Sequence, residues 1–319
     1  MDSTKSSSTA VKEMVKYSIV VPVYNSANIV GEMIDRTVTF FEQHGLDYEL
    51  ILINDGSQDQ SWERIQKKAV DNDHLIAINL LKNYGQHTAV YCGFQKSSGD
   101  YIITLDDDLQ NPPEECIHLI NKIQEGHDLV FGRFRQKQHA SYRRLGSRLI
   151  GWMNSKIFNK PDGLILTNFR IIRRDVVERV SAYQTNYPYI PGLLLMFAVN
   201  PANVWVEHQS RPIGGSNYNL VKILQLVMRL LFNYSSYPLR LVSLLGMVVA
   251  AISFIFGSVY LIRALLIGIS VPGWATLVVL SSFLNGLTLL ILGMLGEYLV
   301  RLLNQVSSGN IYYIKEVVE

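Results

Sequence analysis

The first two thirds of the chain alternate short hydrophobic runs with longer segments of helical spacing. The runs are rich in β-branched residues and predict strands at 17–24, 48–54, 75–81 and 100–105. Helices are predicted in the segments that follow, over 29–44, 60–71, 86–97 and 113–125. This alternation is typical of an α/β domain with a mostly parallel sheet covered by helices on both faces. Ligands of such sheets bind at the carboxyl ends of the strands, so we expect the site in the loops that follow them.

The last third of the chain has two long stretches without a charged residue, 241–262 and 264–296. Each is long enough to cross a bilayer, which takes about 20 apolar residues in a helix. Pro272 and Gly273 lie within the second stretch and predict a short turn between two helices. The pattern therefore predicts a transmembrane hairpin over 238–304. Two buried core helices of a soluble protein are the alternative, but such helices rarely run so far without charge.

Basic residues on both sides of the hairpin predict its orientation. Lys222, Arg229 and Arg240 precede the first stretch and Arg301 follows the second, whereas the loop 268–273 carries no charge. Positively charged flanks favour the cytoplasmic side, so both ends of the hairpin and the α/β domain are predicted to be cytoplasmic. The first residues have no apolar core and are not typical of a signal peptide. We therefore predict an integral protein of the inner or plasma membrane.

These patterns divide the chain into five segments. A Ser-rich tail, 1–16, precedes the α/β domain at 17–217. Segment 218–237 alternates apolar and basic residues with helical spacing, which predicts an amphipathic helix at the bilayer surface; a core helix with a basic outer face is the alternative. The hairpin, 238–304, is followed by a cytoplasmic tail at 305–319. The end of that tail alternates like a strand and could pair with the sheet edge of a neighbouring subunit.

Composition agrees with this division. Hydrophobic residues make up 48% of the 319 residues and charged residues 18%, and the hairpin accounts for the positive mean hydropathy of +0.14. The formal net charge of +2 gives no reason to expect a nucleic-acid partner. The two cysteines form no CxxC pair, and no HExxH, GxxxxGK[ST] or GxGxxG motif occurs. A P-loop ATPase and a dinucleotide-dependent dehydrogenase therefore lose their main support.

Acidic residues follow two of the predicted strands, as NDGS at 54–57 and DDD at 106–108. In an extended strand end, Asp106 and Asp108 point to one side and Asp107 to the other. Two carboxylates this close repel each other unless a cation lies between them, and oxygen ligands suit Mg²⁺ or Mn²⁺ on a diphosphate. Each motif alone is also typical of a solvated turn. Their joint occurrence at strand ends favours a metal and nucleotide site.

Seven motifs in succession resemble those of a known enzyme family. They are VPVYN at 21–25, NDGS at 54–57, LLKNYGQHTAVYCGF at 80–94, LDDDLQNPPE at 105–114, FGRFR at 131–135, NFRIIRRDVV at 168–177 and RPIGGSNYNL at 211–220. The succession is similar to that of family-2 glycosyltransferases with the GT-A fold. Within that family it resembles the polyisoprenyl-phosphate glycosyltransferases, which include dolichol-phosphate mannose synthase and the bactoprenol glucosyltransferases of the GtrB type. The two-helix ending favours the bactoprenol branch.

The resemblance implies a role for each matching residue. The nucleotide pocket would be lined by Pro22, Tyr24, Asp55, Lys82 and Asp107. The metal ligands would be Asp106, Asp108 and Gln110. The phosphate of the acceptor would be held by Arg133, Arg135, Arg211 and Ser216. The reaction itself would be carried by Asp106, Asp108, Arg133 and Arg211. A carboxylate that accepts from a base N–H, as expected of Asp55, suits uracil and guanine alike.

The chain departs from the family pattern at two places. Ser26 and Ala27 stand where the family often has two glutamates, and Asn168 stands where many relatives have an aspartate. That aspartate is the candidate general base, so a base-catalysed step has no obvious residue here. A lipid phosphate needs little activation, since phosphate monoesters have a second pKa of about 6 and are largely ionised at neutral pH. Positioning and charge can then carry the reaction.

We predict an inverting, metal-dependent transfer of one sugar, with glucose from UDP-glucose favoured, to undecaprenyl phosphate at the cytoplasmic membrane face. The resemblance also implies a homotetramer. One alternative is a GDP-mannose-dependent synthase acting on dolichyl or polyprenyl phosphate. The other is a non-catalytic membrane subunit that binds sugar nucleotides. A processive polysaccharide synthase is disfavoured because the chain has no QxxRW motif and too few predicted spans for a channel.

Overall fold

The computed structural model describes residues 15–134, 141–209, 273–306 and 310–319, with scattered positions between 228 and 266. Over 141–149 it describes the backbone alone. The chain forms two compact units. The first consists of Met1–Asn217 together with Asn310–Glu319, and the second of Tyr218–Gly309. The first unit contains the sheet and all the described candidate site residues.

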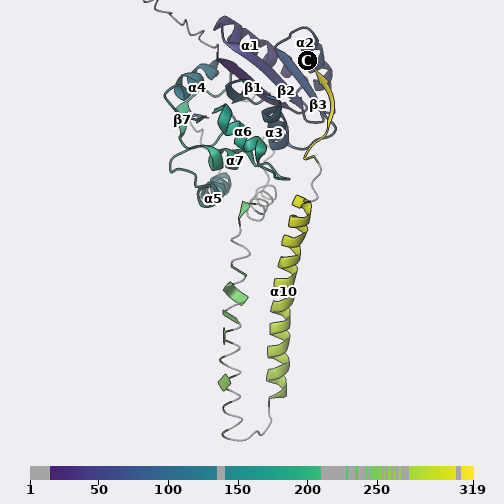
Figure 1. Cartoon of the computed structure of the whole chain (residues 1–319), viewed down its shortest axis with the longest axis vertical. Helices are drawn as coiled ribbons and strands as arrows, with labels where there is room; N and C mark the ends of the chain where they lie inside the picture. Colours follow the sequence, from purple (N-terminus) through teal and green to yellow (C-terminus); the bar gives the residue numbers. More distant parts are fainter. Residues whose placement is uncertain are drawn as a thin grey trace, which may run out of the picture. The chain divides into compact units, whose positions relative to one another are not determined.

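An eight-stranded sheet forms the centre of the first unit (Figure 1), in the order β7-β5-β6-β4-β1-β2-β3-β8. The strands are β1 Lys16–Val23, β2 Asp47–Asn54, β3 Leu75–Leu80, β4 Tyr101–Thr104, β5 Leu129–Arg133, β6 Arg170–Arg173, β7 Pro201–Trp205 and β8 Ile314–Val318. Strands β1 to β4 are parallel to one another, and β5 is parallel to β7. Only β6 and β8 run antiparallel to their neighbours in the described sheet. The predicted α/β class with a mostly parallel sheet is confirmed.

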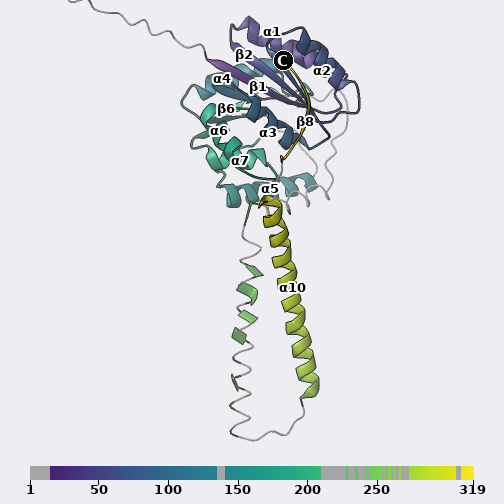
Figure 2. The same ribbon diagram turned by 45° about the vertical axis from the view of Figure 1, so that its right-hand side comes forward.

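The C-terminal strand β8 pairs with β3 of its own chain, with Ala77 opposite Val318. Figures 1 and 2 show β8, in yellow, along that edge of the sheet. Leu81 donates its backbone N–H to Tyr313 at 2.9 Å, and the Tyr312 hydroxyl donates to Gln95 at 2.6 Å. The expected pairing of this segment with a neighbouring subunit is therefore replaced by pairing within the chain. The alternating pattern identified the strand correctly but could not identify its partner.

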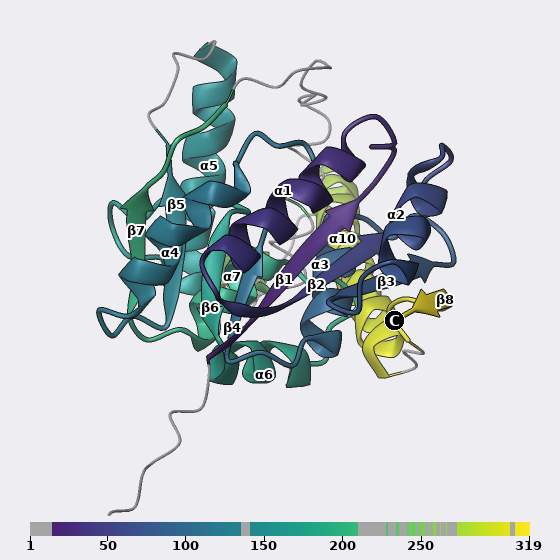
Figure 3. The ribbon, with the colours of Figure 1, turned by 90° about the horizontal axis from the view of Figure 1, so that it is seen from above.

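Helices cover both faces of the sheet (Figure 3). On one face lie α1 Val30–Gln43, α2 Ser61–Val70 and, after the short 3-10 turn η1 Pro113–Glu115, α4 Cys116–Ile123. On the other lie α3 Gln86–Lys96, α6 Arg174–Ala182 and α7 Ile190–Phe197, with α5 Ser141–Phe158 packed against α7. Every strand and helix predicted in the first 125 residues is present, with ends shifted by three residues at most.

Burial on both faces explains why the central strands are continuous apolar runs rather than alternating ones. Ile19 and Val21 of β1 belong to the cluster shared with α1 and α4, whereas Val20 faces α3. Helix α3 lies so close to the sheet that a Cβ on Gly93 would come within 2.3 Å of a methyl group of Val20. A glycine at this position therefore lets α3 pack closely against β1 and β2.

Helix α10, Trp274–Val306, is the long helix of the second unit. Taken over the described residues, the structure contains no helix with both the length and the apolar character that crossing a bilayer takes. The segment 218–237 and the first hydrophobic stretch lie outside the described residues apart from scattered positions. The membrane hairpin and the amphipathic helix stay predictions.

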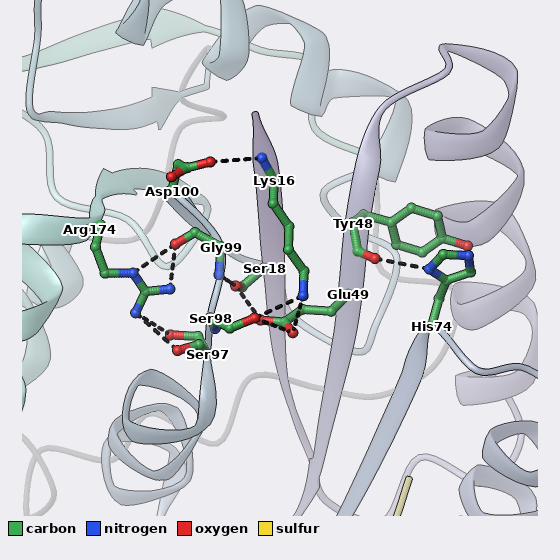
Figure 4. A network of polar contacts seen from close by, with 10 residues as sticks. All are labelled: Lys16, Ser18, Tyr48, Glu49, His74, Ser97, Ser98, Gly99, Asp100 and Arg174. Atoms are coloured by element: carbon green, nitrogen blue, oxygen red, sulfur yellow. Dashed lines mark hydrogen bonds and ion pairs between the residues drawn. The ribbon is translucent and has the colours of Figure 1, made fainter. Parts of the chain in front are cut away.

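A buried carboxylate joins three segments at the amino end of the sheet (Figure 4). Glu49 on β2 is 7% exposed and accepts hydrogen bonds from the Ser18 hydroxyl at 2.6 Å, the Lys16 ammonium at 2.9 Å and the Ser98 backbone N–H at 2.6 Å. Burial alone would raise the pKa of Glu49, but these hydrogen bonds outweigh it and hold that pKa below the ordinary value of 4.5. Glu49 thus ties β1, β2 and the α3–β4 connection together in its ionised form.

We predict that Glu49→Gln lowers the free energy of unfolding by about 2 kcal/mol at neutral pH, the scale of a hydrogen bond to a charged group. Urea unfolding of the full chain, followed by circular dichroism, measures the loss. Because the pKa of Glu49 is lower in the folded state, its contribution is complete above pH 4.5 and disappears as the pH falls. The difference between the two proteins should therefore shrink in acid. Glu63→Gln, at an exposed position of α2, is the matched control; equal losses from the two variants would contradict the role of Glu49.

Candidate functional site

The loops after β1, β2, β3 and β4 meet at the carboxyl edge of the sheet, as parallel strands require. Direct hydrogen bonds join them in pairs. The loop after β2 binds the loop after β3 through Asp55, and the loop after β4 binds the loop after β1 through Asp107. The backbone N–H of Asn25, in the loop after β1, donates to the Ser57 hydroxyl oxygen, in the loop after β2, at 3.0 Å. Residues more than 80 positions apart in the sequence are thereby brought into one site.

Asn25 makes a second contact with the loop after β2. The Asn25 side chain in turn accepts from the backbone N–H of Gln58 at 2.9 Å. Asn25 itself has a positive φ of 52°, a conformation that asparagine tolerates better than most residues. The loops after β1 and β2 are therefore fixed against each other in both directions.

Asp55 organises the loop after β3. It is 2% exposed, and its two carboxylate oxygens accept the backbone N–H groups of Tyr84 at 2.7 Å and Gly85 at 2.9 Å. Burial raises the pKa of Asp55, and these two hydrogen bonds oppose the rise. Sequence reasoning missed this role. Each carboxylate oxygen of Asp55 has further lone pairs, and these can accept the predicted hydrogen bond from a nucleotide base.

The glycine of the NDGS motif permits this contact between loops. Gly56 has a φ of +65°, and a Cβ on it would lie 2.5 Å from the backbone nitrogen of Asn83. The loop 81–85 therefore packs directly on the turn. It carries Lys82, an exposed residue whose ammonium lies 5.4 Å from the centre of the Tyr84 ring. Asp55 and Lys82, predicted from separate motifs, are thus brought close together.

Asp107 connects the loop after β4 to the loop after β1. It accepts the Ser26 hydroxyl at 2.5 Å and the backbone N–H of Tyr24 at 3.2 Å. Tyr24 is 45% exposed at the end of β1 and is free to meet a ligand ring, whereas Pro22 is buried within β1 opposite Ile53. Pro22 therefore lies inside the sheet, next to the loop that carries Tyr24.

Asp106 lies at the centre of the acidic cluster. Its Oδ1 accepts from the side-chain amides of Gln86 at 2.6 Å and Asn168 at 3.4 Å. Burial, joined by repulsion from Asp108 and Asp107, raises the pKa of Asp106 to about 7. The carboxylates of Asp106, Asp107 and Asp108 repel one another, and this repulsion favours the binding of a cation among them.

The turn after Asp106 brings the other predicted metal ligands together. Asp108 accepts the backbone N–H of Gln110 at 3.1 Å, and Gln110 accepts the N–H of Gln209 at its carbonyl at 2.9 Å. Across the described residues, no group of three His, Cys, Asp or Glu side chains is arranged to hold a metal. Two carboxylates still fit Mg²⁺ or Mn²⁺, because these ions usually take one or two carboxylates and complete their shell with phosphate and water.

A buried arginine lies beside this cluster. Arg170 begins β6 opposite Thr104, is 1% exposed and donates to the Thr167 carbonyl at 3.3 Å. Burial lowers its pKa to about 10, and the charge of Asp106 opposes that shift. Burial and the charge of Arg170 also lower the pKa of His87 to about 4, so this imidazole is neutral at physiological pH. Nothing in the local sequence indicates that Arg170 is buried or that its charge acts on His87.

Arg133, predicted to hold a phosphate, ends β5 at the same edge of the sheet. Its guanidinium carbon lies 4.4 Å from the centre of the Trp205 ring. Its Nε is buried and, among the described residues, has no hydrogen-bond partner. The stacked guanidinium is therefore held in place with donor capacity left for an anion. The other predicted phosphate ligands, Arg135, Arg211 and Ser216, lie outside the described residues.

Known proteins share this sequence pattern. A family model described as Glycosyl transferase family 2 matches residues 18–181. The undecaprenyl-phosphate 4-deoxy-4-formamido-L-arabinose transferase of Proteus mirabilis (strain HI4320) is 35% identical over 306 residues, which cover 95% of this chain and 94% of that protein. The protein of the same name from Yersinia pestis (strain Pestoides F) is 37% identical over 309 residues, with the same two shares.

Solved structures share the fold. Glucosyl-3-phosphoglycerate synthase from Mycobacterium tuberculosis, in complex with Mn²⁺, UDP and phosphoglyceric acid, superposes with a TM-score of 0.50 at 18% identity. The match covers 69% of this chain and 77% of that one. At this level of identity the likeness shows the fold alone, and it confirms the predicted GT-A architecture.

We predict that Gly56→Ala destabilises the site more than a positive φ alone explains. Gly45 is the matched control, because its φ of +60° is nearly the same but nothing lies within 4 Å of a Cβ placed there. Gly45→Ala should cost about 1–2 kcal/mol from backbone strain, and Gly56→Ala should cost more because the loop 81–85 must move. Urea unfolding compares the two variants, and calorimetric binding of UDP reports on the loop. Equal stability losses and unchanged UDP binding would show that the loops do not depend on this close approach.

Proposed function

The chain belongs to glycosyltransferase family 2, and from that membership we propose that it transfers one sugar from a nucleoside diphosphate to undecaprenyl phosphate. The observation that carries the proposal is the meeting of Asp55, Asp106 and Asp107 at one edge of the sheet. Nucleotide, diphosphate and metal can bind together there. The relatives that match nearly the whole chain are named for a sugar transfer to undecaprenyl phosphate, which supports the same acceptor.

The identity of the sugar is proposed from the relatives. Their names give 4-deoxy-4-formamido-L-arabinose, not the glucose that the bactoprenol branch led us to favour, and not mannose. We therefore place the formamido sugar first and glucose from UDP-glucose second. The chain is a glycosyltransferase, so the alternative of a non-catalytic binding subunit is not retained.

The donor end of the site follows from the strand-end loops. Tyr24, Asp55 and Lys82 would contact the nucleotide, and Asp106 and Asp108, with Gln110, would hold Mg²⁺ or Mn²⁺. When bound, the metal would neutralise charge on the leaving nucleoside diphosphate. The solved neighbour of the same fold was crystallised with Mn²⁺ and UDP, which is consistent with this arrangement.

The acceptor end is proposed to lie at Arg133. Its stacked guanidinium, with Arg135, Arg211 and Ser216, would hold the lipid phosphate on the opposite side of the sugar. A phosphate oxygen then forms the new bond to the anomeric carbon while the bond to the diphosphate breaks, and this in-line displacement inverts the centre. Because the ionised phosphate is already a nucleophile, no proton has to be removed, and Asn168 need not act as a base.

A lipid acceptor requires an enzyme that works at the bilayer. We propose that the hairpin over 238–304 anchors the chain and that 218–237 lies at the membrane surface, with the catalytic unit in the cytoplasm. The uncharged stretches and their basic flanks support this arrangement. A homotetramer, implied by the resemblance, belongs to the same proposal.

A donor screen tests the proposed reaction. The purified full chain, with Mg²⁺ or Mn²⁺ and undecaprenyl phosphate, is offered the UDP-activated formamido sugar, UDP-glucose or GDP-mannose, and lipid-linked sugar is measured. We expect the formamido sugar to be transferred at least tenfold faster than the others. Faster transfer from UDP-glucose would overturn the choice of sugar, and no transfer from any donor would overturn the reaction.

We predict that Asp108→Ala lowers kcat by about 100-fold or more, the scale of losing one charge-stabilising group in a transfer reaction. Asp73→Ala, at an exposed turn before β3, is the matched control and should keep normal activity. Transfer of sugar to undecaprenyl phosphate is the readout. Normal turnover by Asp108→Ala would exclude Asp108 as a metal ligand.

A further inference from the structure

The two oxygens of Asp106 have different surroundings. Both of its hydrogen bonds fall on Oδ1, one from the Gln86 amide at 2.6 Å and one from the Asn168 amide at 3.4 Å. Within the described part of the chain, Oδ2 has no hydrogen-bond donor. The carboxylate is thus held at one oxygen and open at the other.

Hydrogen bonds hold the backbone at or next to both Gln86 and Asn168. Gln86 is the first residue of α3 and follows Gly85, whose N–H is bound by Asp55. The Asn168 carbonyl accepts the hydroxyl of Thr104 on β4. Two parts of the site, the α3 start and the turn before β6, therefore converge on one carboxylate oxygen.

Neutral donors suit this position. A lysine or arginine bound to Oδ1 would add positive charge where a divalent cation is to bind, whereas an amide orients the oxygen without adding charge. The buried cation nearby, Arg170, donates to the Thr167 carbonyl and meets Asp106 only through longer-range attraction. The amides can therefore fix the direction of Asp106 without competing for its charge.

We propose that Gln86 and Asn168 are positioning residues that hold Oδ1 of Asp106 and leave Oδ2 for the divalent cation. The inference rests on the proposed function, since it takes Asp106 as a metal ligand. It gives Asn168 a role as a hydrogen-bond donor in place of the base that the family pattern suggests. Partners that orient a metal ligand in this way typically change metal affinity by about 10–100-fold when removed.

The test measures metal binding apart from turnover. Full-length Gln86→Leu and Asn168→Leu variants are titrated with Mn²⁺ in the presence of UDP, and free Mn²⁺ is followed by electron paramagnetic resonance. We expect each variant to bind Mn²⁺ about tenfold more weakly than the unmodified chain. UDP affinity without metal, measured by calorimetry, should be unchanged. Gln43→Leu, an exposed glutamine at the end of α1, is the matched control.

The outcomes separate this inference from the proposed function. If the unmodified chain binds no Mn²⁺ with UDP, the proposed metal site is wrong and the positioning role falls with it. If the unmodified chain and both variants bind Mn²⁺ equally, the positioning role alone is wrong. If the variants also lose UDP affinity without metal, the two amides support the whole pocket and not Asp106 in particular, which likewise overturns the inference. Gln86 is exposed, so its replacement leaves the core packing intact.

Discussion

Crowding of carboxylates at one edge of a parallel sheet is the constraint on which the site depends. The strand order brings Asp55 and the run 106–108 to the same edge. Burial raises the pKa of Asp55, and burial together with repulsion between carboxylates raises the pKa of Asp106 and of Asp107. Neutral groups donate hydrogen bonds to each of these carboxylates. Asp55 accepts two backbone N–H groups, Asp107 a hydroxyl and a backbone N–H, and Asp106 two side-chain amides. The same hydrogen bonds that relieve the crowding also join the loops.

At the amino end of the sheet, a buried carboxylate is neutralised by a cation of the fold itself. Glu49 there has a cation, Lys16, within 2.9 Å together with hydroxyl and backbone donors, so its charge is satisfied within the fold. Asp106 has no cation at such a distance in the described residues, and its pKa is raised where that of Glu49 is lowered. A carboxylate that the fold fully satisfies is structural. One that the fold leaves short of positive charge is available to a ligand.

Local patterns predicted the central strands because those strands are buried on both faces and are therefore apolar throughout. They did not predict that Arg170, the first residue of β6, is buried, since arginine is almost always at the surface. They also could not say that β8 pairs with β3, because the partner of an edge strand is set by the path of the chain and not by its own alternation. The motifs predicted which carboxylates meet, but the donors on Ser26, Gln86 and Asn168 depend on contacts between distant segments.

The two departures from the family pattern have one physical explanation. Ser26 stands where the family often has a glutamate, and it donates to Asp107; Asn168 stands where many relatives have an aspartate, and it donates to Asp106. Each replacement therefore removes a negative charge next to the DDD run and adds a hydrogen-bond donor. The middle residue of that run, Asp107, is itself an aspartate and adds a negative charge to it. A glutamate at position 26 would replace this donor with a second carboxylate near Asp107, and like charges so close repel each other.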